Sequence, residues 1–85
     1  MDNMKPVDAG DPLNAAVAKV LRLAQTEVDI TDVALAIQAD VKVQTLRRYL
    51  DGARPMQVGP FIRISDALGV DSTEVIRRAR QRLAE

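Results

Sequence analysis

The sequence has no cysteine, no histidine and no tryptophan, and its 85 residues include one tyrosine and one phenylalanine. Without cysteine no disulfide bond can form, and without cysteine and histidine the usual zinc sites are excluded. Catalysis through a Ser–His or Cys–His pair is excluded for the same reason. There is also no glycine-rich nucleotide loop. We therefore expect a protein that is not an enzyme, with no catalytic residues, no metal and no cofactor.

Long apolar stretches are also missing. No run approaches the ~20 residues that a membrane-spanning helix needs, and the N-terminal MDNMKPVDAGDP lacks the apolar middle of a signal peptide. We expect a cytoplasmic, nucleoid-associated protein with no membrane partner and no evident small-molecule ligand. Hydrophobic residues make up 47% of the chain and charged residues 28%, which fits one small globular domain.

The formal net charge is zero, but the charges are unevenly distributed. Residues 1–41 carry three basic and seven acidic residues, a net charge of −4. Residues 42–85 carry nine basic and five acidic residues, a net charge of +4. A neutral total can hide a basic binding face, although two ordinary solvated surfaces would give the same distribution.

Apolar residues recur at helical spacing in five segments, which predicts an all-α fold without strands. Residues 1–10 are expected to form a flexible tail, and residues 11–85 a compact five-helix domain. The first helix is expected over residues 11–25. Asp11 suits its N-cap, and Pro12 suits its first helical position, where a missing N–H costs nothing.

The second and third helices are expected on either side of a short break. Thr31 is the predicted N-cap of the second helix, and Asp32 lies in its first turn, where the helix dipole favours an acid. Asp40 follows this helix, in a turn that a left-handed aspartate can make. The third helix is expected over residues 43–50, followed by Gly52 at a position that favours a left-handed residue.

Proline, glycine and a capping pattern mark the last two helices. Residues 53–59 are expected to form a loop, and Pro60 to open the fourth helix, which Gly69 ends. Asp71 and Glu74 form a capping-box pattern at the start of the fifth helix. The predicted buried stripes are Leu13, Val17, Val20, Leu21 and Ala24 in the first helix, Phe61, Ile64, Ala67 and Leu68 in the fourth, and Val75, Ile76, Ala79 and Leu83 in the fifth.

A helical wheel divides the third helix into a small buried stripe and a polar outward face. Two helices joined by a turn of three or four residues have helix-turn-helix geometry, in which the second helix enters the DNA major groove. Glutamine can pair with adenine there, and arginine with guanine. A surface helix with merely solvated arginines is the alternative. The stripe is Leu46 and Leu50 flanked by Val43 and Tyr49, the outward face is Gln44 and Arg48, and the flanks are Arg47 and Asp51 on one side and Thr45 on the other.

Several residues at fixed spacings carry a resemblance to a known family. They are Ile30–Thr31, Leu35–Ala36, Asp40 and Val41, Leu46, Gly52, and the segment ISDALGVDSTEVI from Ile64 to Ile76. At these positions the chain resembles the Cro and lambdoid-phage repressor type of helix-turn-helix protein, also called the Xre-like family. The resemblance implies a five-helix DNA-binding domain with its motif at about residues 31–51, commonly a dimer on a pseudo-palindromic operator.

The resemblance also implies which residues contact DNA. Carried over position by position, the base-reading residues are Val43, Gln44 and Arg48. The secondary candidates are Lys42, Thr45 and Arg47, and positions that usually contact phosphate fall on Arg54 and Gln57. For Val43, packing at the edge of the core and contact with a thymine methyl group are both open.

Two acidic residues depart from the family pattern. Asp32 stands where the family often has a glutamine that meets a phosphate, and Asp40 stands where the family usually has glycine. Since phosphate repels a carboxylate, we expect Asp32 to weaken or re-orient docking on DNA.

Taken together, these features predict a sequence-specific DNA-binding transcriptional regulator. We expect a small repressor of the phage or prophage type that binds double-stranded DNA in the major groove, as a homodimer at least on DNA. Only nine residues follow Ile76, so we expect any dimer to form through helical surface, with the fifth helix as the leading candidate. The alternative is a protein-interaction module, antitoxin-like or an adaptor, with weak or no specific DNA binding. The neutral charge balance and the acidic first half favour that alternative.

Overall fold

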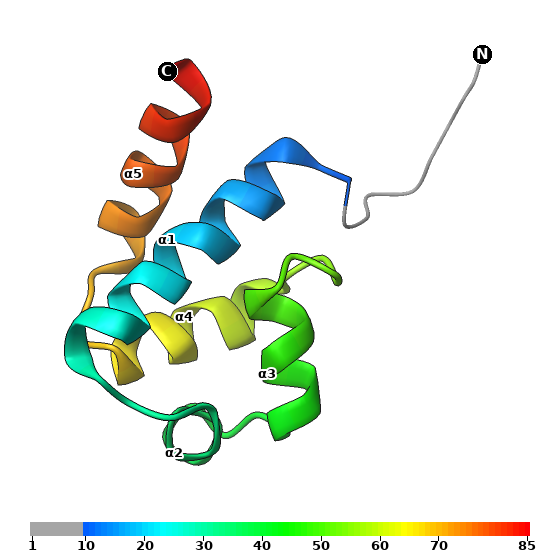
Figure 1. Cartoon of the computed structure of the whole chain (residues 1–85), viewed down its shortest axis with the longest axis vertical. Helices are drawn as coiled ribbons and strands as arrows, with labels where there is room; N and C mark the ends of the chain where they lie inside the picture. Colours follow the sequence, from blue (N-terminus) through cyan, green and yellow to red (C-terminus); the bar gives the residue numbers. More distant parts are fainter. Residues whose placement is uncertain (1–9) are drawn as a thin grey trace.

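The computed structural model describes residues 10–85, and this part of the chain consists of five α-helices with no strand. The predicted all-α, five-helix fold is confirmed. Of the predicted tail, residues 1–9 lie outside the described residues. Figure 1 shows the helices, which are α1 (Pro12–Val28), α2 (Asp32–Ala39), α3 (Val43–Leu50), α4 (Val58–Ala67) and α5 (Ser72–Ala84).

The first helix begins where the sequence predicts but ends later. Asp11 caps α1 and Pro12 occupies its first turn, as expected. The helix continues to Val28 instead of ending near residue 25, because Asp29 adopts the left-handed conformation, with φ at 57°. The N–H of Asp29 then bonds to the carbonyl of Gln25 at 2.9 Å and closes the last turn.

The helix-turn-helix segment forms as predicted. The Oγ1 atom of Thr31 accepts a hydrogen bond from the N–H of Ala34 at 3.1 Å and caps α2. Asp40 ends α2 in the left-handed conformation, with φ at 56°. The third helix spans the predicted residues 43–50, and Gly52 after it has φ at 73°.

The fourth helix begins two residues earlier than predicted. Val58 and Gly59 belong to α4 and not to the preceding loop, so Pro60 is its third residue rather than its first. Proline is tolerated there because the first four N–H groups of a helix have no partner within the helix. The Nε atom of Arg63 donates to the carbonyl of Ala39 at 2.9 Å, which joins α4 to the C-terminal end of α2.

At the start of α5 the predicted capping box is only half formed. Asp71 is the N-cap, and its carboxylate accepts the N–H of Thr73 at 2.7 Å. Glu74 does not reach back to the cap, because its carboxylate binds Arg77 at 2.6 Å and Arg78 at 2.8 Å on the same helix. The hydrogen bonds from Arg77 and Arg78 lower the pKa of Glu74.

All five helices share one core. Figure 1 shows α1 beside α5, with α3 on the other side of the molecule and α2 at its base. Each helix contributes one of the most deeply buried apolar side chains, which are Leu21, Leu35, Leu46, Ile64 and Val75. Within the described residues, no helix is long and apolar enough to cross a membrane.

Two residues of the predicted stripes are exposed. Leu13 is 38% exposed, because it lies in the first turn of α1 at the rim of a surface pocket. Leu83 is 48% exposed, in the last turn of α5, which projects past α1 in Figure 1. Val17 and Ala79 are buried as the stripes predict. Phe61 is partly buried against the core.

Candidate nucleic-acid interface

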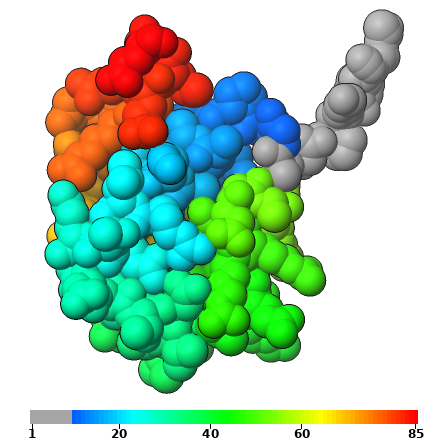
Figure 2. Space-filling model, in the orientation of Figure 1, coloured from blue at the N-terminus to red at the C-terminus, as the bar shows by residue number. Residues whose placement is uncertain are grey.

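The outward face of α3 presents Gln44 and Arg48 to solvent. These residues are four apart, so their side chains lie one above the other on the same side of the helix. Leu46 and Leu50 hold the opposite side of α3 in the core. Figure 2 shows the α3 segment, in green, at the surface of the molecule beside the blue-green α2 segment. Two of the three predicted base-reading side chains, those of Gln44 and Arg48, therefore share one accessible face.

The other candidates on and before α3 differ in exposure. Val43 is half-buried and packs against the core, so its role at the edge of the core is what the structure shows. Thr45 is also half-buried, on the other flank of the helix. Lys42 is exposed and occupies the N-cap position of α3 without making a side-chain cap. Of these three, Lys42 is the most accessible to a ligand.

Arg47 is engaged with another part of the protein, unlike Arg48. Its Nε atom donates to the Oδ2 atom of Asp32 at 3.1 Å, which joins α3 to the start of α2. No hydrogen bond from its two Nη atoms occurs within residues 10–85. Arg47 can therefore hold Asp32 through Nε and still donate from Nη to another acceptor. The two adjacent arginines thus have different surroundings.

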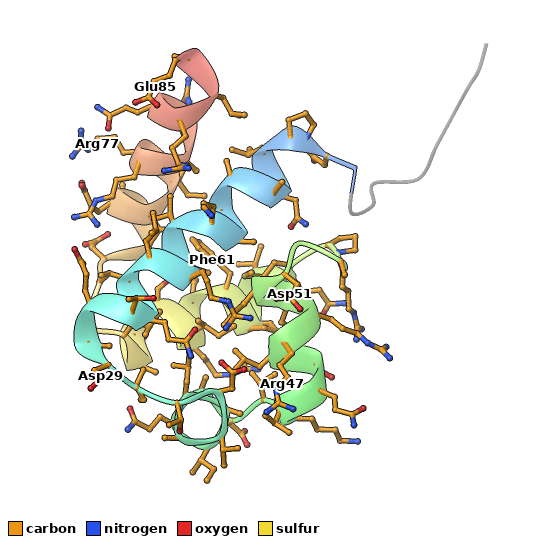
Figure 3. All side chains as sticks on the ribbon, viewed as in Figure 1. Asp29, Arg47, Asp51, Phe61, Arg77 and Glu85 are labelled. Carbon is orange, nitrogen blue, oxygen red and sulfur yellow. The ribbon has the colours of Figure 1, made fainter. Side chains whose placement is uncertain are left out.

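Asp32 accepts two further hydrogen bonds from α1. Its Oδ1 atom lies 2.7 Å from Nε2 of Gln25 and 3.0 Å from Nη1 of Arg22. Arg22 continues through Nη2 to the Oδ1 atom of Asp51, at 2.8 Å, directly after α3. Figure 3 labels Arg47 on α3 and Asp51 at the C-terminal end of that helix. We call Arg22, Asp32, Arg47 and Asp51 the ionic network.

The ionic network keeps Asp32 charged. The hydrogen bond from Gln25 lowers the pKa of the Asp32 carboxyl, and Arg47 and Arg22 add to this effect against the opposing effect of burial. Burial lowers the pKa of Arg22, but its hydrogen bonds to Asp51 and Asp32 outweigh this and raise it. The sequence offers only part of this network: the wheel places Arg47 and Asp51 on one flank, but nothing in the pattern of α1 marks Arg22.

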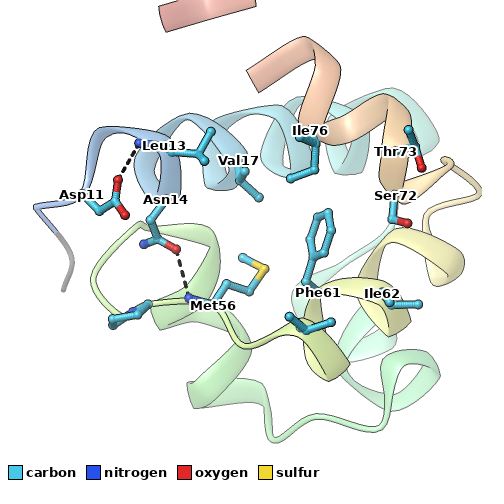
Figure 4. Close-up of a pocket in the computed structure, with 12 residues that line it drawn as sticks. Asp11, Leu13, Asn14, Val17, Met56, Phe61, Ile62, Ser72, Thr73 and Ile76 are labelled. Atoms are coloured by element: carbon cyan, nitrogen blue, oxygen red, sulfur yellow. Dashed lines mark hydrogen bonds between the residues drawn. The ribbon is translucent and has the colours of Figure 1, made fainter. Parts of the chain in front are cut away.

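The loop after α3 is tied to α1 by one side chain. The Oδ1 atom of Asn14 accepts the N–H of Met56 at 2.9 Å, as Figure 4 shows, and its Nδ2 atom donates to the carbonyl of Arg54 at 3.3 Å. The guanidinium carbon of Arg54 lies 5.5 Å from the centre of the Tyr49 ring. Arg54 and Gln57 are both exposed, so the loop holds two predicted phosphate contacts beside α3.

An apolar pocket of about 400 Å³ lies between α1, this loop, α4 and α5. Figure 4 shows Leu13, Val17, Met56, Phe61 and Ile76 around it. Most of its wall is apolar, and no cluster of charged side chains converges in it. Nor do residues 10–85 contain a group of three or more acidic side chains that could hold a metal ion. These features do not identify a small ligand.

Comparison with known proteins shows the fold. Neither the family models nor the curated protein sequences give a match. A crystal structure of the clp gene regulator ClgR from Corynebacterium glutamicum superposes with a TM-score of 0.80 at 22% identity, over 85% of this chain and 77% of that one. A second ClgR structure gives a TM-score of 0.76 at 20% identity, over 94% of this chain and 96% of that one. Residues 10–85 therefore form an all-α helix-turn-helix domain with the fold that ClgR has.

Proposed function

We propose that this protein is a sequence-specific DNA-binding transcriptional regulator. The exposed face of α3, with Gln44 and Arg48 one turn apart, is the observation that carries the proposal. Both side chains can form two hydrogen bonds to one base edge in the major groove, where glutamine donates to and accepts from adenine and arginine donates to guanine. The fold likeness to ClgR, a protein named as a gene regulator, supports the same function.

In the proposed mechanism, phosphate contacts set the register and base contacts select the sequence. Lys42, Arg54 and Gln57 are exposed around α3 and hold the DNA backbone. Gln44 and Arg48 read bases, Val43 contacts a base from the edge of the core, and Thr45 and Arg47 are secondary contacts. The protein bound at its DNA site then blocks RNA polymerase.

The more specific part of the proposal is a small repressor of the phage or prophage type. It rests on the resemblance to the Cro and lambdoid-phage repressor family, whose members commonly bind a pseudo-palindromic operator as dimers. A homodimer, formed at least on DNA, would place two α3 helices on two half-sites about one turn of DNA apart. Such a repressor acts in the cytoplasm, at the nucleoid.

Selection from a random pool of DNA duplexes at moderate salt tests this function. We expect enrichment of a palindromic site that the wild-type protein then binds in a quantitative assay. Arg48→Ala should weaken binding to that site by ~1–3 kcal/mol and relax the preference at one base pair. Lys19→Ala is a matched control, because Lys19 is an exposed basic residue of α1 to which no DNA or dimer contact is assigned. An equal loss on every sequence would make Arg48 a phosphate contact and not a base reader.

A second candidate function is a protein-interaction module. The observation that favours it is exposed apolar surface away from the core. Ile37 on α2 is 75% exposed, Val33 lies one turn before it, and Val58 and Ile62 are exposed on α4. Apolar patches of this kind often mark contacts with other proteins. Binding without an enriched sequence, or no DNA binding, would favour this candidate over the regulator.

A further inference from the structure

The side chain of Asp32 is turned into the protein, at a position where the family resemblance places a phosphate contact. It begins α2, yet its carboxylate accepts from Gln25 and Arg22 of α1 and from Arg47 of α3. The side chain is 25% exposed, and Gln25 is buried. In this structure the acid is therefore paired within the protein and is not an isolated negative charge at the surface.

The ionic network holds α3 at two points on one flank. Arg47 binds Asp32, and Asp51, one turn later, binds Arg22, which itself binds Asp32. Two contacts one helical turn apart resist rotation of the helix about its own axis and also keep it from pivoting about a single contact. The third helix has eight residues, so its own hydrogen bonds contribute little stability. The flank that is held adjoins the exposed face of Gln44 and Arg48.

The charges of the network also cancel. Asp32 and Asp51 are paired with Arg22 and Arg47, so this flank adds no net charge to the surface around α3. Partly exposed ion pairs contribute little stability one by one, but a hydrogen-bonded network fixes geometry. Base reading depends on geometry, because a bidentate hydrogen bond is lost when the donor moves by about 1 Å.

We propose that Asp32 is a positioning residue, which orients α3 for base reading by holding Arg47 and, through Arg22, Asp51. This inference rests on the proposed DNA-binding function and adds a residue that touches no base itself. It also changes the expected effect of replacing Asp32 on DNA binding. An acid that merely repels phosphate would weaken binding to every sequence, whereas a positioning acid strengthens the preference for the right sequence.

The test compares Asp32→Asn with Asp40→Asn on the selected site and on random DNA. Both changes remove one negative charge near α3, but Asp40 has no side-chain hydrogen bond or ion pair within residues 10–85. We expect Asp32→Asn to reduce the ratio of specific to non-specific affinity by about tenfold or more, comparable to the loss of one base contact. Asp40→Asn should leave this ratio unchanged. Thermal unfolding checks that both variants are folded at the assay temperature.

A double-mutant cycle tests whether Asp32 acts through Arg47. Arg47→Met removes the same contact from the other side, so adding it to Asp32→Asn should cause little further loss of preference. If the double variant instead loses preference by the product of the two single losses, Asp32 and Arg47 do not act together and the inference is overturned. If the wild type shows a preferred site and Asp32→Asn binds all DNA more tightly with the same preference, the inference fails and the proposed function stands. A wild type without any preferred site overturns both.

Discussion

Replacing Asn14 should lower the stability of the domain by an amount that follows from its two hydrogen bonds. Asn14→Ala removes the acceptor for the half-buried N–H of Met56, at 2.9 Å, and the donor to the carbonyl of Arg54, at 3.3 Å. An N–H that loses its partner away from water costs ~1–2 kcal/mol, and the longer, exposed bond adds little. For a domain of this size, 1 kcal/mol corresponds to roughly 4–8 °C in Tm, so we expect a fall of about 4–16 °C.

A conservative variant at the same position divides the effect between the two bonds. Asn14→Asp keeps an oxygen for the N–H of Met56, but its second oxygen replaces the donor to Arg54 and must turn away from that carbonyl, so it should lose less stability than Asn14→Ala. Gln81→Ala on α5 serves as a control, because it truncates an exposed amide that makes no side-chain hydrogen bond within residues 10–85. Thermal unfolding followed by circular dichroism measures all three.

Asn14→Ala should also change DNA binding. The loop that Asn14 holds carries Arg54 and Gln57, the proposed phosphate contacts. Binding at a temperature where the variant is folded should therefore weaken about equally for all sequences, because phosphate contacts carry no sequence information. An unchanged Tm would show that Asn14 is not a tether for the loop. A selective loss at one base pair would contradict the assignment of the loop to phosphate.

Asp40→Asn should raise DNA affinity about equally for all sequences in a filter-binding assay, since it removes a charge beside α3, whereas Asp29→Asn, at the equally left-handed end of α1, should not. Because the fold lowers the pKa of Asp32, its stabilising contribution is present above the unfolded pKa of roughly 4 and is lost as the pH falls through the lower folded value. The difference in unfolding free energy between wild type and Asp32→Asn, from urea titrations, should therefore shrink below about pH 4, and a constant difference to pH 2 would refute this. Arg54→Ala should flatten the dependence of log affinity on log salt by about one unit, and an unchanged slope would remove Arg54 from the phosphate contacts. Gly52→Ala should cost roughly 1–2 kcal/mol, because φ is 73° although the nearest atom lies 3.8 Å from the added Cβ. Gly59→Ala in α4 should cost less, because the added Cβ meets only the end of the flexible Arg63 side chain, at 3.3 Å.

Local sequence signals predicted the helix-turn-helix segment because each boundary has its own chemical marker. Thr31 caps α2 through its side chain, Asp40 tolerates left-handed backbone, and Gly52 favours it. Where the marker is weak, the prediction failed. Asp29 ends α1 in the same conformation as Asp40, but its segment TEVDI predicts a connection between helices, so the last turn of α1 was missed.

The contacts between helices could not be predicted in the same way. A wheel shows that Arg47 lies on a flank of α3, but the identity of its partner depends on how α2 and α1 pack against that flank. Arg22 has an ordinary polar setting in the sequence, and only the fold brings it between Asp32 and Asp51. Similarly, the predicted capping role of Glu74 lost to two arginines on the same helix.

The core shared by all five helices has a consequence for cooperativity. The second and third helices have eight residues each, and their buried side chains pack in the same core as those of the longer helices. Helices of this length are not stable alone in water. The two helices of the motif should therefore not melt separately from α1, α4 and α5, and domains of this size usually unfold in one step. Heat would then abolish DNA binding and helicity at the same temperature, and a peptide of α2 and α3 alone would be unfolded.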